Sequence, residues 1–164
     1  MLPGLERLHA ESPVPIAYGE RTYSLSGFET LVSRNTVDVL QPDATVCGGI
    51  LECIEVADYA KANNLKVYPH IGGLSAVGLA ANIQFAVIIG TDMLEYDSNP
   101  YQPLRDKILK EPILSWDYIE DGCLKVPEGP GLGIEIDESA FEQYPYKKGN
   151  IYPDVHPQFG LGTF

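Results

Sequence analysis

Short apolar runs alternate with longer amphipathic segments along residues 1–97. The longer segments repeat apolar residues with the 3.6-residue period of a helix, and the short runs, closed by proline or glycine turns, are typical of strands. We predict the end of a helix at Leu5–Ala10 and full helices at Ser24–Arg34, Ile50–Asn63 and Leu74–Ile89. We predict strands at Pro15–Tyr18, Val37–Gln41, Leu65–Tyr68 and Met93–Tyr96. Strands that alternate with helices through short loops form βα units, so the predicted fold class is α/β with a parallel sheet.

The alternation ends near Asp97. One short helix is expected at Leu104–Lys110, and beyond it lie the turn-rich segment Pro127–Gly133 and a tail rich in tyrosine, proline and glycine. The chain therefore divides into residues 1–97, which form the βα units, and residues 98–164, which we expect to wrap over the rest of the protein. At the start of the helix predicted from Ser24, this serine has the residue type of an N-cap.

Charge and cysteine content exclude several classes of function. The 164 residues carry a formal net charge of −12, and so acidic a surface repels phosphate backbones and anionic lipid, which argues against binding to nucleic acid or membranes. The cysteines, Cys47, Cys53 and Cys123, form no CxxC pair, so we expect reduced thiols and not disulfides or a zinc site. No apolar run reaches the ~20 residues of a membrane span, and residues 1–15 lack a signal peptide's basic start, which favours a cytoplasmic protein.

A polar residue stands at the end of each predicted strand. Glu20 follows IAYG, Asp43 follows VLQP, His70 follows VYP, and Glu95 lies within MLEYD. Parallel strands lie roughly 4.8 Å apart and end at one shared rim, so Asp43 and His70 can reach hydrogen-bonding distance. A carboxylate on one imidazole nitrogen raises the basicity of the other, which makes a general base. Glu20 is a hard oxygen ligand suited to Mg²⁺, and Glu95 could donate a proton or a hydrogen bond to a substrate oxygen.

Five separated motifs then carry a resemblance to a known family. "PIAYGE", "QPDATVCGG", "VYPHIGG", "LEYD" and "VPEGPGLGIEID", in this order and spacing, resemble the C-terminal half of the mandelate racemase branch of the enolase superfamily. The resemblance covers Leu2–Glu138. In that family an α+β capping domain precedes a modified (β/α) TIM-type barrel, and by the resemblance this chain begins at the helix before the fifth barrel strand.

The resemblance implies a role for each polar residue at the rim. Glu20 would be the third of three carboxylate ligands to Mg²⁺. Asp43 and His70 would form the dyad at the ends of strands six and seven, with His70 taking or returning a proton. Glu95, at the end of strand eight, would hydrogen-bond a developing enediolate or act as an acid. Histidine is too weak a base for a proton α to a carboxylate unless the resulting dianion is stabilised, which Mg²⁺ does.

Details of the sequence favour one branch of that superfamily. The muconate cycloisomerase and dipeptide epimerase branch has a lysine base on strand six, and residues 37–49 contain no lysine. The acid-sugar dehydratase and racemase branch is therefore preferred. Two positions depart from its pattern, because Leu51 stands where many relatives have Thr or Ser and Gln84 stands where His is common.

The parts of the family pattern that precede the fifth strand have no counterpart in this sequence. We expect residues 1–97 to be the C-terminal half of the barrel, and residues 98–164 to return toward a capping domain outside the chain. The first barrel strands and the first two metal ligands would also lie outside it. Four strands cannot close an eight-stranded barrel, so we expect a fragment that binds Mg²⁺ poorly and is inactive alone.

For the parent protein, the resemblance implies a Mg²⁺-dependent enzyme that removes the proton α to the carboxylate of a sugar acid or 2-hydroxy acid. Dehydration is the commoner chemistry of this branch, and racemisation, which needs a second base outside this chain, stays open. A homo-oligomeric parent is expected. The rival interpretation is a non-catalytic α/β scaffold whose rim residues only cap helices and pair with loops. A nucleotide-binding Rossmann unit is disfavoured, because no GxGxxG follows a strand.

Overall fold

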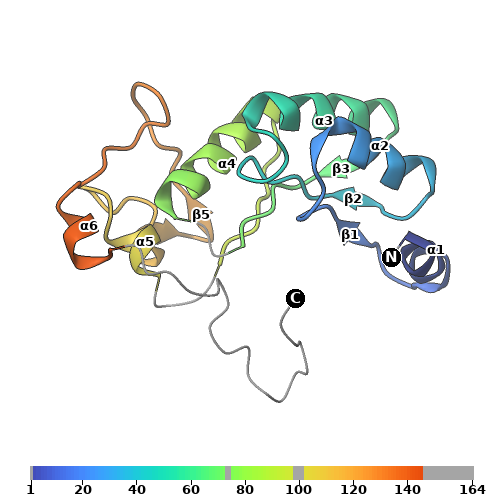
Figure 1. Ribbon diagram of the computed structural model, residues 1–164, viewed down its shortest axis with the longest axis horizontal. Helices are drawn as coiled ribbons and strands as arrows, with labels where there is room; N and C mark the ends of the chain where they lie inside the picture. The colour runs from blue at the N-terminus through green and yellow to red at the C-terminus, as the bar shows by residue number, and fades with distance from the viewer. Residues whose placement is uncertain (1, 73–74, 98–101, 146–164) are drawn as a thin grey trace, which may run out of the picture.

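A computed structural model describes residues 2–72, 75–97 and 102–145 (Figure 1). The helices in these ranges are α1 (Leu2–Glu11), α2 (Ser24–Ser33), α3 (Ile50–Ala62), α4 (Ala76–Ile89), α5 (Pro103–Asp106) and α6 (Ala140–Gln143), with a 3-10 turn, η1, at Trp116–Tyr118. The strands are β1 (Ala17–Tyr18), β2 (Val39–Leu40), β3 (Lys66–Val67), β4 (Ile119–Glu120) and β5 (Cys123–Leu124). From α1 to α4, helices and strands alternate in the order that the hydrophobic pattern predicts.

The first three strands form a parallel sheet in the order β1-β2-β3. Ala17 lies opposite Val39, and Leu40 lies opposite Val67. Parallel neighbours need a crossover connection, and here α2 joins β1 to β2 while α3 joins β2 to β3. Both helices lie on the same side of the sheet (Figure 1). The predicted α/β class with a parallel sheet is confirmed.

The main hydrophobic core lies between this sheet and its helices. Leu40 of β2, Phe28 of α2 and Phe85 of α4 are fully buried and belong to one cluster. The free cysteines Cys47 and Cys53 are buried in the same cluster, as expected for reduced thiols that pack. A core residue of this size contributes roughly 1.5–3 kcal/mol through burial, so the sheet depends on the helices for its stability.

Helix α4 serves two cores at once. Leu79 and Ile83 pack in a second cluster with residues of the C-terminal segment: Ile108, Leu114 and Ala140, whereas other residues of the same helix enter the main core. A helix that is apolar on all sides is typical of one that is buried between layers, and α4 lies between the βα units and the C-terminal elements (Figure 1). Within the described ranges, no helix is long and apolar enough to span a membrane.

The prediction of a fourth strand at Met93–Tyr96 is wrong, because the parallel sheet ends at β3. Among the described residues, the backbone of Met93–Tyr96 is joined to the segment of β3 by one hydrogen bond, from the Glu95 N–H to the Pro69 oxygen at 3.2 Å. A strand needs a continuing ladder of such bonds. The apolar pattern of the segment reflects burial against the C-terminal cluster, where Leu94 and Tyr96 pack.

The length of one helix and the cap of another also differ from the prediction. The helix predicted at Leu104–Lys110 is the shorter α5, since Pro103 starts it in the first turn that proline favours. Ser24 is not an N-cap but the first residue of α2, with a positive φ of 56°. The start of α2 is capped from α3 instead, where the Glu52 carboxylate accepts the Leu25 N–H at 2.6 Å. The proposed boundary at residue 97 stays a prediction.

We expect Gly19→Ala to lower the free energy of unfolding by about 2–4 kcal/mol, because it combines backbone strain with overpacking. Gly19 has a φ of +145°, and a Cβ there would lie 2.7 Å from Cε1 of Phe28 and 3.0 Å from the backbone nitrogen of Gln41. Urea unfolding followed by circular dichroism measures the loss. Gly4→Ala is the control, since a Cβ at that helical position meets nothing within 4 Å. Equal stability of the two variants would contradict this role for Gly19.

Candidate active site at the carboxyl ends of the strands

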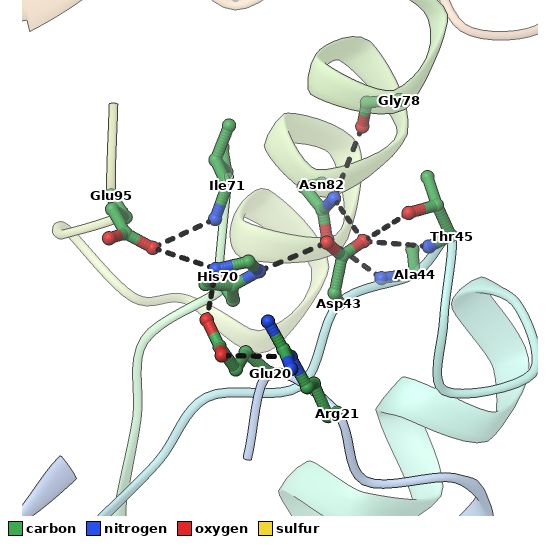
Figure 2. Close-up of polar contacts among 10 residues, drawn as sticks. All are labelled: Glu20, Arg21, Asp43, Ala44, Thr45, His70, Ile71, Gly78, Asn82 and Glu95. Carbon is green, nitrogen blue, oxygen red and sulfur yellow. Dashed lines mark hydrogen bonds and ion pairs between the residues drawn. The ribbon is translucent and has the colours of Figure 1, made fainter. Parts of the chain in front are cut away.

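The ends of β1, β2 and β3 bring Glu20, Asp43 and His70 to one rim of the sheet (Figure 2). Backbone pairing between the segments continues past the last strand residues. The Tyr68 N–H donates to the Leu40 oxygen at 3.1 Å, and the His70 N–H donates to the Pro42 oxygen, also at 3.1 Å. These bonds extend the parallel register into the loops, so His70 lies directly beside Asp43.

The predicted contact between His70 and Asp43 is confirmed. Nδ1 of His70 lies 3.1 Å from Oδ2 of Asp43. The other carboxylate oxygen, Oδ1, accepts hydrogen bonds from the backbone N–H of Thr45 and from its hydroxyl, both at 2.8 Å, and from Nδ2 of Asn82 at 3.0 Å. Asp43 is 2% exposed, so this carboxylate is buried and yet fully hydrogen-bonded.

The environment shifts the pKa values of both members of the dyad. Burial opposes ionisation of Asp43, but hydrogen bonds from His70, Asn82 and Thr45 outweigh it and hold the pKa of Asp43 below its ordinary value. The hydrogen bond to Asp43 raises the pKa of His70. Burial opposes that rise, and the negative charges of Glu95, Asp43 and Glu20 add to it. A histidine with a raised pKa is a stronger proton acceptor than a free imidazole.

The second imidazole nitrogen faces the two remaining rim carboxylates. Nε2 of His70 lies 3.1 Å from Oε2 of Glu20 and 3.6 Å from Oε2 of Glu95. Glu95 is held there by the Ile71 N–H, which donates to its Oε2 at 3.0 Å, although the segment that carries it is not a strand. Both glutamate side chains are nearly half exposed, at 45% and 46%, so Nε2 is on the open side of the dyad.

Gly72 leaves space for the histidine ring itself. A Cβ at this position would lie 2.7 Å from Cε1 and 2.9 Å from Nε2 of His70. Side chains at such distances do not coexist with the observed ring position. The absence of a side chain at Gly72 therefore accommodates the imidazole, which is a more specific reason for glycine than a tight turn alone.

Comparison with known proteins identifies the family. Residues 1–140 match the family described as "Enolase C-terminal domain-like". The chain belongs to this family. The resemblance found in the motifs is confirmed, and the α/β fold with parallel strands is that of an enolase C-terminal domain.

Similar proteins include enzymes named for sugar-acid chemistry. D-Galactarolactone cycloisomerase of Agrobacterium fabrum is 32% identical over 152 residues, which cover 87% of this chain and 39% of that protein. Arabinonate dehydratase of Saccharolobus solfataricus is 36% identical over 143 residues, which cover 86% of this chain and 36% of that protein. A solved structure of an enolase superfamily member from Polaromonas sp. JS666 is 33% identical with a TM-score of 0.79, and covers 90% of this chain and 38% of that one. This enolase-type chain thus spans less than two fifths of the length of these relatives.

The described rim residues do not form a metal site by themselves. Glu20 offers one half-exposed carboxylate beside His70, and its other oxygen, Oε1, lies 3.3 Å from Nε of Arg21. Within the described residues, no group of three or more His, Cys, Asp and Glu side chains could hold a metal ion. The Glu20 carboxylate has the chemistry of one Mg²⁺ ligand, and a complete site would need further oxygen ligands. The predicted roles of Glu20, Asp43, His70 and Glu95 stay predictions.

Two residues that bind Asp43, Asn82 and Thr45, were not predicted from the sequence. Thr45 comes so soon after Asp43 that its hydrogen bonds form a local turn of the kind aspartate favours. Asn82 is fully buried in α4. One signal could have found it, since Asn82 is a lone asparagine within the apolar stretch LSAVGLAANIQFAVII and a buried amide needs polar partners.

We expect the free energy of unfolding to fall as pH rises through the raised pKa of His70. A group whose pKa is higher in the folded state contributes stability below its unfolded pKa of 6.5 and loses that contribution at higher pH. Urea unfolding at several values between about pH 5 and 9 tests this, with His70→Gln as the variant that lacks the titration. An unchanged pH dependence in His70→Gln would show that another group is responsible.

Gly72→Ala should displace the imidazole from Asp43 without unfolding the chain. The added methyl group meets the ring, so the hydrogen bond to Asp43 weakens and the pKa of His70 moves back toward its ordinary value. Titration of the histidine by NMR measures this, with the open-position variant Gly4→Ala as the control. A pKa of His70 equal to that of the unmodified chain would contradict the close packing.

Proposed function

We propose that this chain carries the proton-transfer part of an active site that removes the proton α to the carboxylate of a sugar acid. The hydrogen bond between His70 and Asp43 is the observation that carries the proposal. An ionised, buried aspartate accepts from Nδ1, and Nε2 faces Glu20 and Glu95 at the open rim. There it can take a proton from a substrate held beside Glu20 and Glu95.

Glu95 would act on the substrate oxygens and Glu20 would bind the metal ion, and neither would take the α-proton. Glu95, fixed by the Ile71 N–H, would donate a hydrogen bond or a proton to the developing enediolate when protonated. Glu20 would supply one ligand to Mg²⁺, with the remaining ligands coming from outside the described residues. The bound cation would polarise the substrate carboxylate and so lower the pKa of its α-proton.

Dehydration is our preferred outcome of that proton transfer. The relatives named above include a dehydratase, and several others similar to this chain are named D-galactonate dehydratases. Loss of the β-hydroxyl as water would follow enediolate formation. Racemisation or epimerisation is the alternative, and it would require a second base on the opposite face of the substrate. A non-catalytic scaffold is the remaining rival, in which the rim contacts serve structure alone.

The proposal extends to the protein in which this chain acts. The chain matches less than two fifths of the relatives' length, so we propose that a further polypeptide segment completes the barrel, the metal site and the capping domain. Residues 1–97 would be its half-barrel, and residues 98–164 would return toward the cap. We further propose a cytoplasmic homo-oligomer that takes a small sugar acid as substrate and binds neither nucleic acid nor membranes.

In the parent protein, His70→Asn should slow exchange of the α-proton of D-galactonate or arabinonate by about 10²–10⁴-fold, the usual contribution of a general base. Proton NMR in D₂O with Mg²⁺ measures the exchange rate, and release of water from the same substrates distinguishes dehydration from racemisation. Gln84→Leu is the matched control, because among the described residues the Gln84 amide binds the Pro127 and Leu132 oxygens and not the rim. Exchange that His70→Asn leaves unaffected would favour the scaffold.

We expect the 164-residue chain by itself to bind Mg²⁺ weakly and to show no turnover. One carboxylate does not hold this cation against its hydration shell. Isothermal titration calorimetry of the chain, with Glu20→Gln for comparison, measures the affinity. Tight binding that survives in Glu20→Gln, or robust α-proton exchange by the chain alone, would overturn the assignment of Glu20 as one of several shared ligands.

A further inference from the structure

The segment that carries Glu95 has few contacts with the sheet. Among the described residues, the Glu95 N–H donates to the Pro69 oxygen, and the Glu95 carboxylate accepts the Ile71 N–H (Figure 2). The Glu95 side chain is 46% exposed, so burial does not fix its position. Leu94 and Tyr96, on either side of it, pack instead against the C-terminal cluster. The position of Glu95 therefore depends on how the C-terminal elements hold its neighbours.

Arg105 of α5 is a buried cation whose charge is balanced within the same helix. The residue is 2% exposed, and its Nε and Nη2 donate to the two carboxylate oxygens of Asp106 at 2.6 and 2.9 Å. This is the bidentate pairing that a guanidinium and a carboxylate favour. Because Asp106 is the next residue in the chain, the pair forms locally and needs no distant segment to balance the charge. The contacts of Nη1 and of the flat face of the guanidinium then decide what Arg105 does in the tertiary structure.

Both of these parts of the guanidinium meet the residues directly after Glu95. Nη1 donates to the backbone oxygen of Asp97 at 2.7 Å. The guanidinium carbon lies 5.0 Å from the centre of the Tyr96 ring, within the roughly 6 Å of a cation–π contact. The Tyr96 hydroxyl donates to the Leu114 oxygen at 2.9 Å, and its ring centre lies 5.7 Å from that of Trp116. Residues 96 and 97 are thus joined to α5 and to the residues that follow it.

We infer that Arg105 is a positioning residue, which anchors Tyr96 and Asp97 to α5 and thereby holds the Glu95 carboxylate at the rim. It acts on Glu95 through the backbone of residues 95–97, in place of the strand ladder that this segment lacks. The action of Glu95 on a substrate rests on the proposed function. The anchoring of residues 96 and 97 does not depend on it, since it joins groups within this chain. The C-terminal elements accordingly shape the site as well as covering the second core.

The test is the hydrogen-exchange rate of the Ile71 N–H in the 164-residue chain, because this amide donates to the Glu95 carboxylate. Arg105→Met keeps most of the side-chain volume and removes the guanidinium. We expect exchange at Ile71 to become about tenfold faster or more, which is the effect of losing one hydrogen bond to a charged group. Glu95→Ala gives the full effect of losing this carboxylate, and Arg105→Met should add nothing further at Ile71 in that background.

Two comparisons separate positioning from a general loss of stability. The His70 N–H donates to the Pro42 oxygen and should keep its exchange rate in Arg105→Met. Lys110→Met is the matched variant, since it removes a cation that pairs with the exposed Glu135, and it should leave Ile71 unchanged. An unmodified rate at Ile71 in folded Arg105→Met would overturn the inference, as would equal acceleration at Ile71 and His70.

A second measurement needs no variant and decides the case in which Arg105→Met does not fold. In the unmodified chain, a guanidinium held by both Asp106 and Asp97 cannot rotate freely. Its Nη protons should therefore give separate NMR signals that exchange slowly with water. A single averaged signal for the Nη protons of Arg105 would overturn the anchoring.

The anchoring and the proposed chemistry can fail separately. Faster Ile71 exchange in Arg105→Met, together with no α-proton exchange by the unmodified parent protein, would reject the proposed function and leave the role of Arg105 intact. An unmodified Ile71 rate in that variant, together with α-proton exchange in the parent that depends on His70, would do the reverse. The measurements on the chain need neither substrate nor metal, so their outcome is independent of turnover.

Discussion

The buried carboxylate of Asp43 is the constraint around which the site is built. An ionised group that is 2% exposed is tolerated only when its lone pairs are filled by donors, since an uncompensated buried charge costs about 3–5 kcal/mol. The donors come from three separate segments: the loop after β2, the loop after β3 and helix α4. Satisfying one carboxylate therefore fixes the relative positions of three elements, and the histidine is placed as part of the same requirement.

Helix α4 connects this requirement to the packing of the whole chain. Its residues enter both hydrophobic clusters, so its position is set by the sheet on one side and by the C-terminal segment on the other. Asn82 extends from that helix to Asp43. Packing energy from two cores thus holds the amide in place, and a precise polar contact is supported by non-directional hydrophobic burial.

The open side of the dyad differs in character from the buried side. Glu20 and Glu95 are nearly half exposed, and they surround Nε2 with negative charge. Three carboxylates around one imidazole raise the pKa of His70, yet they would also repel the anionic substrate of the proposed reaction. A cation at Glu20 would relieve that repulsion, which gives a physical reason for the proposed Mg²⁺ that is independent of the family comparison.

The sequence by itself determined the alternation of strands and helices, the parallel sheet and the meeting of Asp43 with His70. These follow from local periodicity and from the rule that parallel strands end at one rim, so short-range information is sufficient. The motifs also determined the family. In contrast, Met93–Tyr96 has a strand-like pattern but no ladder, because strand formation depends on partners that a local pattern does not contain. Likewise, Glu52 and not Ser24 caps α2, and Asn82 from a distant helix holds Asp43. Only the tertiary structure decided these contacts, since each joins residues far apart in the chain whose partner choice is set by packing.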